Sequence, residues 1–335
     1  MTHSQYKSRP LLEVKNFSFT FTHNPNHTVV SDVNFSLYPN EFIGIIGESG
    51  SGKSVTAKAI LQLNSLKGKE VKGSKILYGG ENLLTYSEEN IRKIRGREIA
   101  IVFQDPMTYL NPTATIGHQI EESLKLHFPH CSSSETYIKT LELLRLVELD
   151  NQKEIYKKYP HELSGGMRQR VMIAIALAPN PRVFIADEIT TALDVTVQHE
   201  ILLLLKKLQK TLAMSIIFIT HDLSIVSNFA SRVIVMYRGK IVEMGPADKI
   251  CTAPEHPYTR ALIDSIPRID MDKASRLESI HVLREEAISG CGFYSRCKFA
   301  QHECKSILPP RKTTSSKEVL CHFPLTEKKE EVLCH

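Results

Sequence analysis

Residues 47–54 constrain the fold of this chain more than any other segment. They read Gly-Glu-Ser-Gly-Ser-Gly-Lys-Ser and directly follow Phe42–Ile46, a continuous apolar run. Such a run is typical of a strand that is covered on both faces. The composition of Val55–Leu63, after the glycines, favours a helix. A strand, a glycine-rich turn and a helix in direct succession predict a unit of an α/β domain.

The glycine-rich turn matches the pattern of a phosphate-binding loop, or P-loop. In such a loop, successive backbone N–H groups turn inward around phosphate oxygens, and the helix N-terminus adds positive potential. We expect Lys53 to reach the β- and γ-phosphates and Ser54 to ligate Mg²⁺. The other residues expected to line the phosphates are Gly47, Ser49, Gly50, Ser51 and Gly52. A flexible glycine turn without a ligand is the alternative, and the flanking strand and helix argue against it.

Strand and helix patterns alternate again in the second half of the chain. Val183–Ala186 and Ser215–Ile219 are apolar runs typical of buried strands, and Asp194–Leu208 between them is an amphipathic helix. This alternation predicts a mainly parallel core sheet between helices. Val233–Met236 and Ile241–Glu243 predict a closing hairpin.

Two further regions complete the domain. Leu11–Val14 and Phe17–Phe21 predict N-terminal antiparallel strands, and Asn24–His27 predicts the turn after them. Residues 113–180 are mostly helical by pattern, which predicts an inserted helical subdomain. We therefore expect one domain over residues 1–267.

Residues 268–335 differ from the rest of the chain because their apolar content is low. They carry five of the seven cysteines. A short segment with a weak core needs a covalent or metal link to stay folded. We expect a small appended C-terminal extension here.

Composition excludes several classes of protein. A chain of 335 residues with 42% hydrophobic residues buries a large core, so disorder is not its main state. The net charge of +5 includes no basic block that would indicate nucleic-acid binding. No apolar run approaches the roughly 18 residues of a membrane span, and the first residues lack the apolar stretch of a signal peptide. We expect a cytoplasmic protein unless a partner holds it at a membrane.

Two carboxylates follow one of the predicted buried strands. Asp187 and Glu188 come directly after Val183–Ala186, at the sheet edge where ligands bind in α/β folds. Asp187 would hold Mg²⁺ through water, and Glu188 would polarise the attacking water. An acidic pair after a strand is commonly a solvated turn, but its place downstream of a P-loop favours the catalytic interpretation.

A second phosphate-binding segment precedes the apolar run Val171–Leu177. Ser164, Gly165 and Gly166 stand at the predicted N-terminus of this helix, where backbone N–H groups are free. A serine cap followed by a glycine turn is the simpler alternative. Leu163–Gly166 together with Gln169 resembles the signature motif of ATP-binding-cassette (ABC) ATPases. In that family two cassettes pair head to tail, and ATP lies between the P-loop of one and the signature of the other.

The resemblance implies roles for four further positions. Gln104 is similar to the Q-loop glutamine, which contacts Mg²⁺ and leads to the surface that meets the membrane partner. Ala192–Asp194 resembles the D-loop, and His221 resembles the switch histidine that contacts the γ-phosphate. Phe21 falls where an aromatic residue stacks on adenine, with His23 as a rival and a purely structural aromatic as the alternative.

Three short segments resemble the oligopeptide/dipeptide importer branch, which also includes nickel and antimicrobial-peptide uptake members. They are Gln104–Pro112, Tyr159–Met167 and His256–Leu262. Two positions depart from the family pattern: Ile189 replaces a proline, which would loosen the turn that aims Glu188, and Tyr109 replaces a small residue. Neither change removes a catalytic group, so we expect a competent site.

The family also implies the partners of this chain. These are two integral-membrane permease subunits, an extracytoplasmic substrate-binding protein and a second ABC ATPase subunit, either related or a copy. The chain would then be the peripheral ATP-hydrolysing subunit at the cytoplasmic face of the membrane, driving di- or oligopeptide import. Nickel or another small solute is an alternative cargo. A soluble ABC ATPase acting on nucleic acid or ribosomes is the rival class, which usually has two cassettes or a long coiled coil; this chain has one P-loop and no sustained heptads.

The clustered cysteines call for a local explanation. Cys291, Cys297, Cys304 and Cys321 are separated by five, six and sixteen residues, without the two-residue gap of common zinc modules. A reducing cytosol argues against disulfides, so the alternatives are an iron–sulfur cluster, zinc or free thiols. The importer branch is associated with a [4Fe–4S] cluster in this extension, which favours the cluster in a structural role. Cys334, near the end of the chain, is expected to be a spare thiol.

Overall fold

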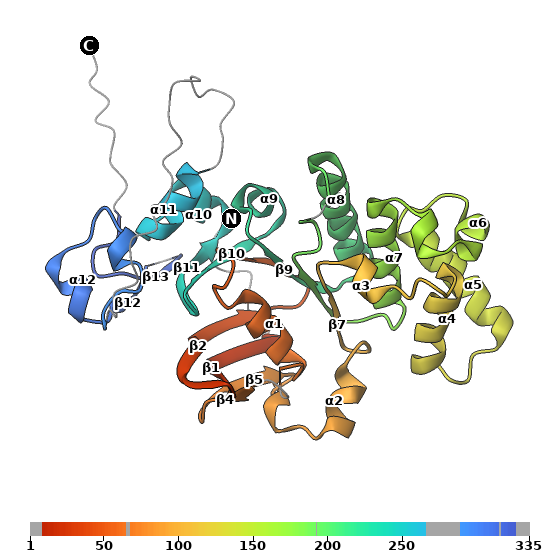
Figure 1. The fold of residues 1–335 in the computed structure, drawn as a ribbon, viewed down its shortest axis with the longest axis horizontal. Helices are drawn as coiled ribbons and strands as arrows, with labels where there is room; N and C mark the ends of the chain where they lie inside the picture. Colours follow the sequence, from red (N-terminus) through yellow and green to blue (C-terminus); the bar gives the residue numbers. More distant parts are fainter. Residues whose placement is uncertain (1–8, 65–67, 192, 266–288, 315, 326–335) are drawn as a thin grey trace, which may run out of the picture. The chain divides into compact units, whose positions relative to one another are not determined.

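The computed structural model describes residues 9–64, 68–191, 193–265, 289–314 and 316–325 (Figure 1). The chain forms two compact units. One unit holds Thr2–Ile43 and Ser54–Thr220, and the other holds Gly44–Lys53 and His221–His335. Strand β3 (Phe42–Ile46) and helix α1 (Lys53–Ile60) carry the chain from one unit into the other.

The first unit begins with an antiparallel sheet, as predicted. Strand β1 (Leu12–Phe21) pairs with β2 (Asn24–Leu37), β4 (Gly68–Glu70) and β5 (Lys75–Tyr78). The short β6 (Glu81–Asn82) pairs with β5.

The prediction of two separate strands before residue 21 is wrong, because β1 is continuous. A register shift lies between Val14 and Phe17, and Asn16 has a φ of +50°. Such a bulge inserts an extra residue and so breaks the alternation of buried and exposed side chains without ending the strand. The predicted turn is also misplaced, since the chain reverses at residues 22–23 and β2 already begins at Asn24.

Three parallel strands follow in the same unit. β7 (Ile99–Val102) pairs with β8 (Val183–Asp187), and β8 pairs with β9 (Ser215–Thr220). Every residue of β8 and β9 is buried, as the unbroken apolar runs predict. Helix α8 (Val195–Leu212) links β8 to β9 and buries its leucine-rich face. The α/β fold class with a parallel-containing core sheet is confirmed.

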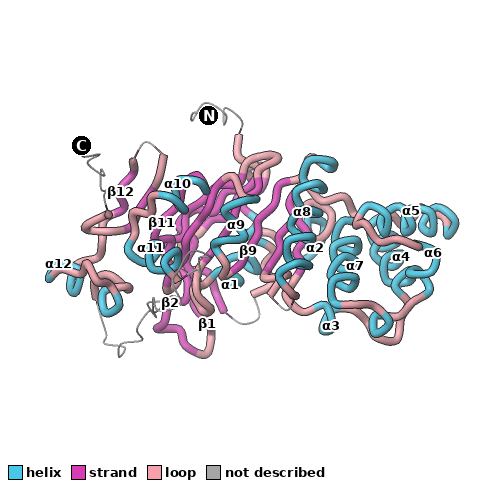
Figure 2. Tube along the Cα trace, turned by 90° about the horizontal axis from the view of Figure 1, so that it is seen from above, coloured by secondary structure: helices cyan, strands magenta, loops and turns pink. Residues whose placement is uncertain are grey.

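A short helix, α3 (Pro106–Tyr109), comes before the region predicted to be helical. Residues 113–180 are mostly helical, as predicted, and form α4 (Ile116–His127), α5 (Ser133–Leu146), α6 (Gln152–Lys157) and α7 (Gly165–Leu177). Thr115, Ser132 and Ser164 cap three of them, each accepting a hydrogen bond from a backbone N–H of the first turn. Figure 2 shows α4, α5, α6 and α7 gathered beside one another. A separate short helix, α2 (Glu88–Ile94), precedes β7. Over the described ranges, no helix has the length and apolarity that crossing a membrane requires.

The second unit is built on the predicted hairpin of β10 (Arg232–Tyr237) and β11 (Lys240–Pro246). The hairpin is preceded by helix α9 (Leu223–Phe229) and followed by α10 (Ala247–Thr252) and α11 (Pro257–Asp264). The C-terminal extension adds a 3-10 turn (Tyr294–Arg296), α12 (His302–Ser306), β12 (Arg311–Thr313) and β13 (Glu318–Leu320).

The extension joins the sheet of the second unit. Strand β13 pairs antiparallel with β11, with Glu243 opposite Val319, and also with β12. The boundary predicted near residue 267 lies outside the described residues and stays a prediction.

Close packing at β3 gives a test of the fold. A Cβ atom at Gly44 would lie 2.0 Å from Cγ1 of Val226 in α9. Gly44→Ala should therefore lower the free energy of unfolding by about 1–3 kcal/mol through overpacking, measured by urea unfolding. Val226→Ala should lower the free energy of unfolding by less in the Gly44→Ala background than in the wild type. Equal costs in both backgrounds would show that this contact is not the cause.

Candidate active site

Hydrogen bonds within the second unit hold the glycine-rich loop in shape. The buried Lys53 donates from Nζ to the carbonyl oxygens of Gly47 (2.8 Å) and Glu48 (3.0 Å). The N–H of Gly239, in the turn between β10 and β11, donates to the carbonyl oxygen of Ser51 (3.0 Å). Gly47 is required because a Cβ there would lie 2.1 Å from the carbonyl oxygen of Met236. The loop is therefore a closed turn with a fixed shape.

One buried hydroxyl in the loop fits an anionic ligand. Ser51 is 3% exposed, and its Oγ has no hydrogen-bond partner in the described part of the chain. A buried polar atom without a partner costs free energy, and a phosphate oxygen would satisfy it. The loop therefore suits the phosphates that its sequence predicts.

Two of the residues predicted to bind Mg²⁺, Ser54 and Asp187, are far apart in the sequence but adjacent in the structure. Ser54, at the start of α1, donates from Oγ to Oδ1 of Asp187 at the end of β8 (2.8 Å). Asp187 is only 5% exposed. Because hydroxyl and carboxylate oxygens are the ligands that Mg²⁺ prefers, this pair suits a magnesium ion.

Glu188 occupies a strained backbone position. Its φ is +54°, in the left-handed region that non-glycine residues rarely adopt. The Glu188 N–H donates to the carbonyl oxygen of Ile219 (3.0 Å), and the Glu188 carbonyl accepts from Oγ1 of Thr191 (3.0 Å). Ile189, which replaces the family's proline, is fully buried. Hydrogen bonds and burial thus fix the direction in which the Glu188 side chain leaves the strand, as is common at functional sites.

The signature segment packs against the start of α8. Ser164 caps α7 by accepting from the N–H of Met167 (3.3 Å), and Gly165 follows it on the exposed end of the helix. A Cβ at Gly166 would lie 2.7 Å from Cγ1 of Val197. Asp194 caps α8 by accepting from the N–H of Val197 (3.0 Å). The structure therefore brings the signature and the described part of the predicted D-loop together; Ala192 lies outside the described residues.

The remaining predicted nucleotide residues stand at strand ends. Gln104 is exposed just after β7, and His221 is exposed directly after β9. Since β7 and β8 are parallel neighbours, Gln104 and Asp187 follow the same edge of the sheet. The rings of Phe21 and His23, the two candidates for stacking on adenine, stack on each other with centroids 5.3 Å apart.

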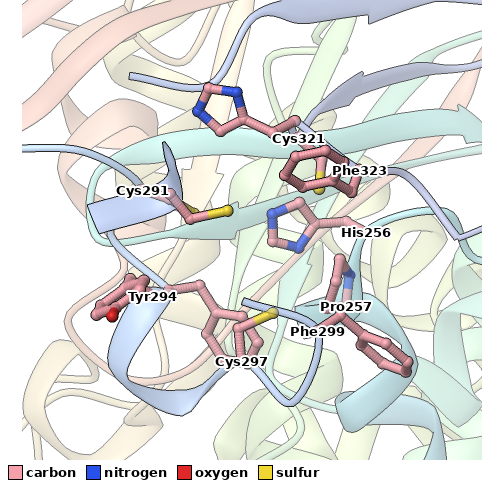
Figure 3. Close-up of a pocket in the computed structure, with 11 residues that line it drawn as sticks. His256, Pro257, Cys291, Tyr294, Cys297, Phe299, Cys321 and Phe323 are labelled. Atoms are coloured by element: carbon pink, nitrogen blue, oxygen red, sulfur yellow. The ribbon is translucent and has the colours of Figure 1, made fainter. Parts of the chain in front are cut away.

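Four of the five cysteines of the extension line one cavity. Cys291, Cys297, Cys304 and Cys321 line it together with His256, Phe293 and Phe299. Figure 3 shows Cys291, Cys297 and Cys321 around His256. Among the described residues, however, no three His, Cys, Asp or Glu side chains lie close enough to hold a single metal ion. Cys334 lies outside the described residues.

Burial raises the pKa of three of these thiols. The pKa values of the Cys297 and Cys321 thiols rise to about 11, mainly because the thiols are buried and partly because other cysteines lie nearby. The pKa of the Cys291 thiol is also raised, mainly by burial. A bound cation would reverse this shift, because it stabilises the thiolate.

Three residues in or beside the loop, Glu48, Tyr258 and Arg296, were not predicted as site residues. The Glu48 side chain pairs with Arg296, 248 positions away, and the Glu48 N–H donates to the Tyr258 hydroxyl oxygen. Tyr258 lies in the segment His256–Leu262, which the sequence analysis used only to place the chain in a branch. The match of that segment to the branch could have identified Tyr258 as a site residue. No local sequence pattern links Glu48 to Arg296.

Comparisons with known proteins agree with this geometry. A family described as "ABC transporter" matches residues 30–191, and one described as "Oligopeptide/dipeptide transporter, C-terminal region" matches residues 242–304. A putative peptide import ATP-binding protein of Brucella abortus is 48% identical over 94% of this chain and 95% of its own length. The dipeptide transport ATP-binding protein DppD of Haemophilus influenzae is 44% identical over 95% of this chain and 96% of its own.

A solved structure shares the cassette fold. The dimeric ATP-binding cassette MJ0796, in a post-hydrolysis state bound to ADP and Pi, is 30% identical with a TM-score of 0.63. The match covers 70% of this chain and 98% of that one.

The raised thiol pKa values predict slow alkylation of the metal-free chain. At pH 7, Cys297 and Cys321 should react with iodoacetamide about a hundredfold more slowly than a thiol of pKa near 9, because only the thiolate is nucleophilic. The rate should rise about tenfold per pH unit and level off near pH 11. Peptide mass spectrometry measures each site. Rates that level off near pH 8 would contradict the buried, protonated state.

Proposed function

This chain belongs to the ATP-binding subunits of the ABC transporter family, in the oligopeptide/dipeptide branch, and we propose that it energises the import of di- or oligopeptides through a membrane permease. It is an ATPase that uses ATP and Mg²⁺. The observation that carries the site assignment is the hydrogen bond between Ser54 and Asp187, which brings together two of the residues proposed to hold Mg²⁺. The names of the relatives support peptides as the cargo over nickel or another solute, and import over action on nucleic acid or ribosomes.

Binding of the nucleotide is assigned to the loop and its flanks. Backbone N–H groups within the loop and the Ser51 hydroxyl would hold the phosphates, with Lys53 as the neighbouring cation. Ser54, Asp187 and Gln104 would hold Mg²⁺, which neutralises charge on the phosphates when bound. Phe21 or His23 would stack on the adenine.

Hydrolysis is assigned to the two residues that follow β8 and β9. Glu188 would accept a proton from the attacking water and orient it, and His221 would contact the γ-phosphate. The exposed N-terminus of α7, with Ser164, Gly165, Gly166 and the nearby Asp194, would bind the ATP held by a second cassette. The dimeric state of MJ0796 supports this pairing. The second cassette would be a related subunit or a copy of this chain.

The import function implies further partners for this chain. The chain would lie peripherally at the cytoplasmic face of the membrane, against two integral-membrane permease subunits, with an extracytoplasmic substrate-binding protein delivering the peptide. Nucleic acid is not among the proposed partners. Affinity purification from solubilised membranes should co-isolate the permease subunits. ATPase activity stimulated by ribosomes or DNA would contradict this function.

The proposed general base predicts a separation of binding from turnover. Glu188→Gln should preserve ATP binding, because the amide keeps the shape of the side chain, and should lower kcat by about 10²–10⁴-fold. Equilibrium ATP binding and phosphate release measure the two effects. Glu154→Gln, at an exposed position on α6, is the control and should leave both unchanged. Unchanged hydrolysis by Glu188→Gln would remove Glu188 from this role.

For the extension, the proposed ligand is a structural [4Fe–4S] cluster held by Cys291, Cys297, Cys304 and Cys321. Four thiols around one cavity suit a Cys₄ cluster. Such a cluster would cross-link the segments of a weakly cored region. Zinc and free thiols are the alternatives.

Metal analysis decides among these three options. The full chain, purified anaerobically, should contain about four iron and four sulfide and little zinc. Cys304→Ser should lose most of the iron, whereas the matched control Cys251→Ser should keep it. One zinc per chain would replace the cluster with a zinc site, and a metal-free chain with a folded extension would refute both.

A further inference from the structure

The second residue of the phosphate loop is clamped by the C-terminal extension. Nη1 and Nη2 of Arg296 lie 2.8 and 2.7 Å from the two carboxylate oxygens of Glu48, a bidentate pair. Arg296 ends the 3-10 turn of the extension and directly precedes Cys297. A bidentate pair fixes the direction of the carboxylate as well as neutralising it.

The charge of Glu48 needs a partner because this carboxylate belongs to the loop that is proposed to bind phosphate. A carboxylate within a loop whose N–H groups face phosphates would repel the anionic ligand, and at a few ångströms this repulsion is large. The Glu48 side chain is 36% exposed, so water alone screens it only in part. Pairing with a guanidinium removes the net negative charge from the loop.

Aromatic side chains hold Arg296 ready for this contact. Its guanidinium lies 5.6 Å from the ring centroid of Tyr237 and 5.8 Å from that of Phe293, and Nη1 also donates to the Tyr237 hydroxyl oxygen (3.2 Å). The Arg296 side chain is only 14% exposed. Because few rotamers remain open to it, little entropy is lost when it pairs.

Tyr258 holds the backbone of the same loop residue. Its hydroxyl oxygen accepts from the Glu48 N–H (2.9 Å), and the side chain is fully buried. Its ring contacts Tyr237 and Phe293, with centroids 4.5 and 5.4 Å apart. The side chain and the N–H of Glu48 are therefore both fixed by residues beyond position 250.

We propose that Arg296 and Tyr258 are positioning residues for ATP binding, which hold and neutralise Glu48 so that the phosphate loop accepts the triphosphate. Phe293, which contacts both Tyr237 and Tyr258, also lines the cysteine cavity. The extension thus completes the nucleotide site of its own chain. The inference rests on the proposed role of residues 47–54 in binding phosphate.

Equilibrium binding to the full-length chain tests it. A fluorescent ATP analogue with Mg²⁺ is titrated into the wild type, Arg296→Gln, Tyr258→Phe and Arg311→Gln. Arg296→Gln should raise Kd about tenfold, since it leaves Glu48 uncompensated. Tyr258→Phe should raise Kd about threefold through the lost hydrogen bond. Arg311→Gln is the matched control: its pairing with Glu318 is long and partly exposed, so Kd should stay within about twofold.

A double-mutant cycle separates positioning from general damage to the fold. In a Glu48→Gln background there is no carboxylate to neutralise, so Arg296→Gln should change Kd by less than about twofold. The kcat of the single variant should stay close to that of the wild type while KM rises. A tenfold effect that persists in the Glu48→Gln background, or an unchanged Kd in the single variant, would overturn the proposal.

Two controls keep the outcomes distinct. If Arg296→Gln does not fold, Arg296→Lys takes its place; lysine keeps the charge but loses the bidentate geometry, so Kd should rise by less, and a wild-type Kd would overturn the proposal. A wild-type chain that binds no ATP analogue would contradict the proposed function itself. Wild-type binding with no effect at Arg296 would contradict only the positioning role.

Discussion

The buried ammonium group of Lys53 is the interaction on which the arrangement of the phosphate loop depends. A charge that is 3% exposed must have partners, and its partners are the carbonyl oxygens of Gly47 and Glu48 at the start of the same loop. The residue that ends the loop is therefore hydrogen-bonded to the residues that begin it. The carbonyl oxygen of Ser51 is held in addition by the N–H of Gly239. These contacts turn a glycine-rich segment, which is flexible by composition, into a defined cradle.

Parallel strands supply the other half of the chemistry. The end of β8 places Asp187 against the Ser54 hydroxyl, and the neighbouring β7 ends just before Gln104. The direction of the Glu188 side chain requires a strained, left-handed backbone at this residue. The buried Ile189 and the hydrogen bond from the Glu188 N–H to Ile219 maintain this conformation. Strain at a single residue after a regular strand is expected where the direction of a side chain matters more for function than local stability does.

Features with local signals could be predicted from the sequence, and features made by distant residues could not. The loop, β8, β9 and the hairpin each follow from contiguous apolar runs and glycine turns. The grouping of four cysteines followed from their crowding in one segment. In β1, the bulge at Asn16 was mistaken for a strand end, because a bulge breaks alternation as a loop does. The pairing of Glu48 with Arg296 spans 248 positions, and a glutamate in a loop or an arginine before a cysteine carries no pattern by itself.

The central claim is that contacts within its own chain hold the phosphate loop in shape. Hydrogen exchange of the nucleotide-free, full-length chain, read by mass spectrometry of peptides covering residues 44–54 and 232–246, tests this directly. The account predicts slow exchange at the amides of Glu48, Ser51 and Gly239, whose N–H groups donate hydrogen bonds within the chain. Exchange of these amides at the rate of an unstructured peptide, with protection appearing only after ATP is added, would contradict it.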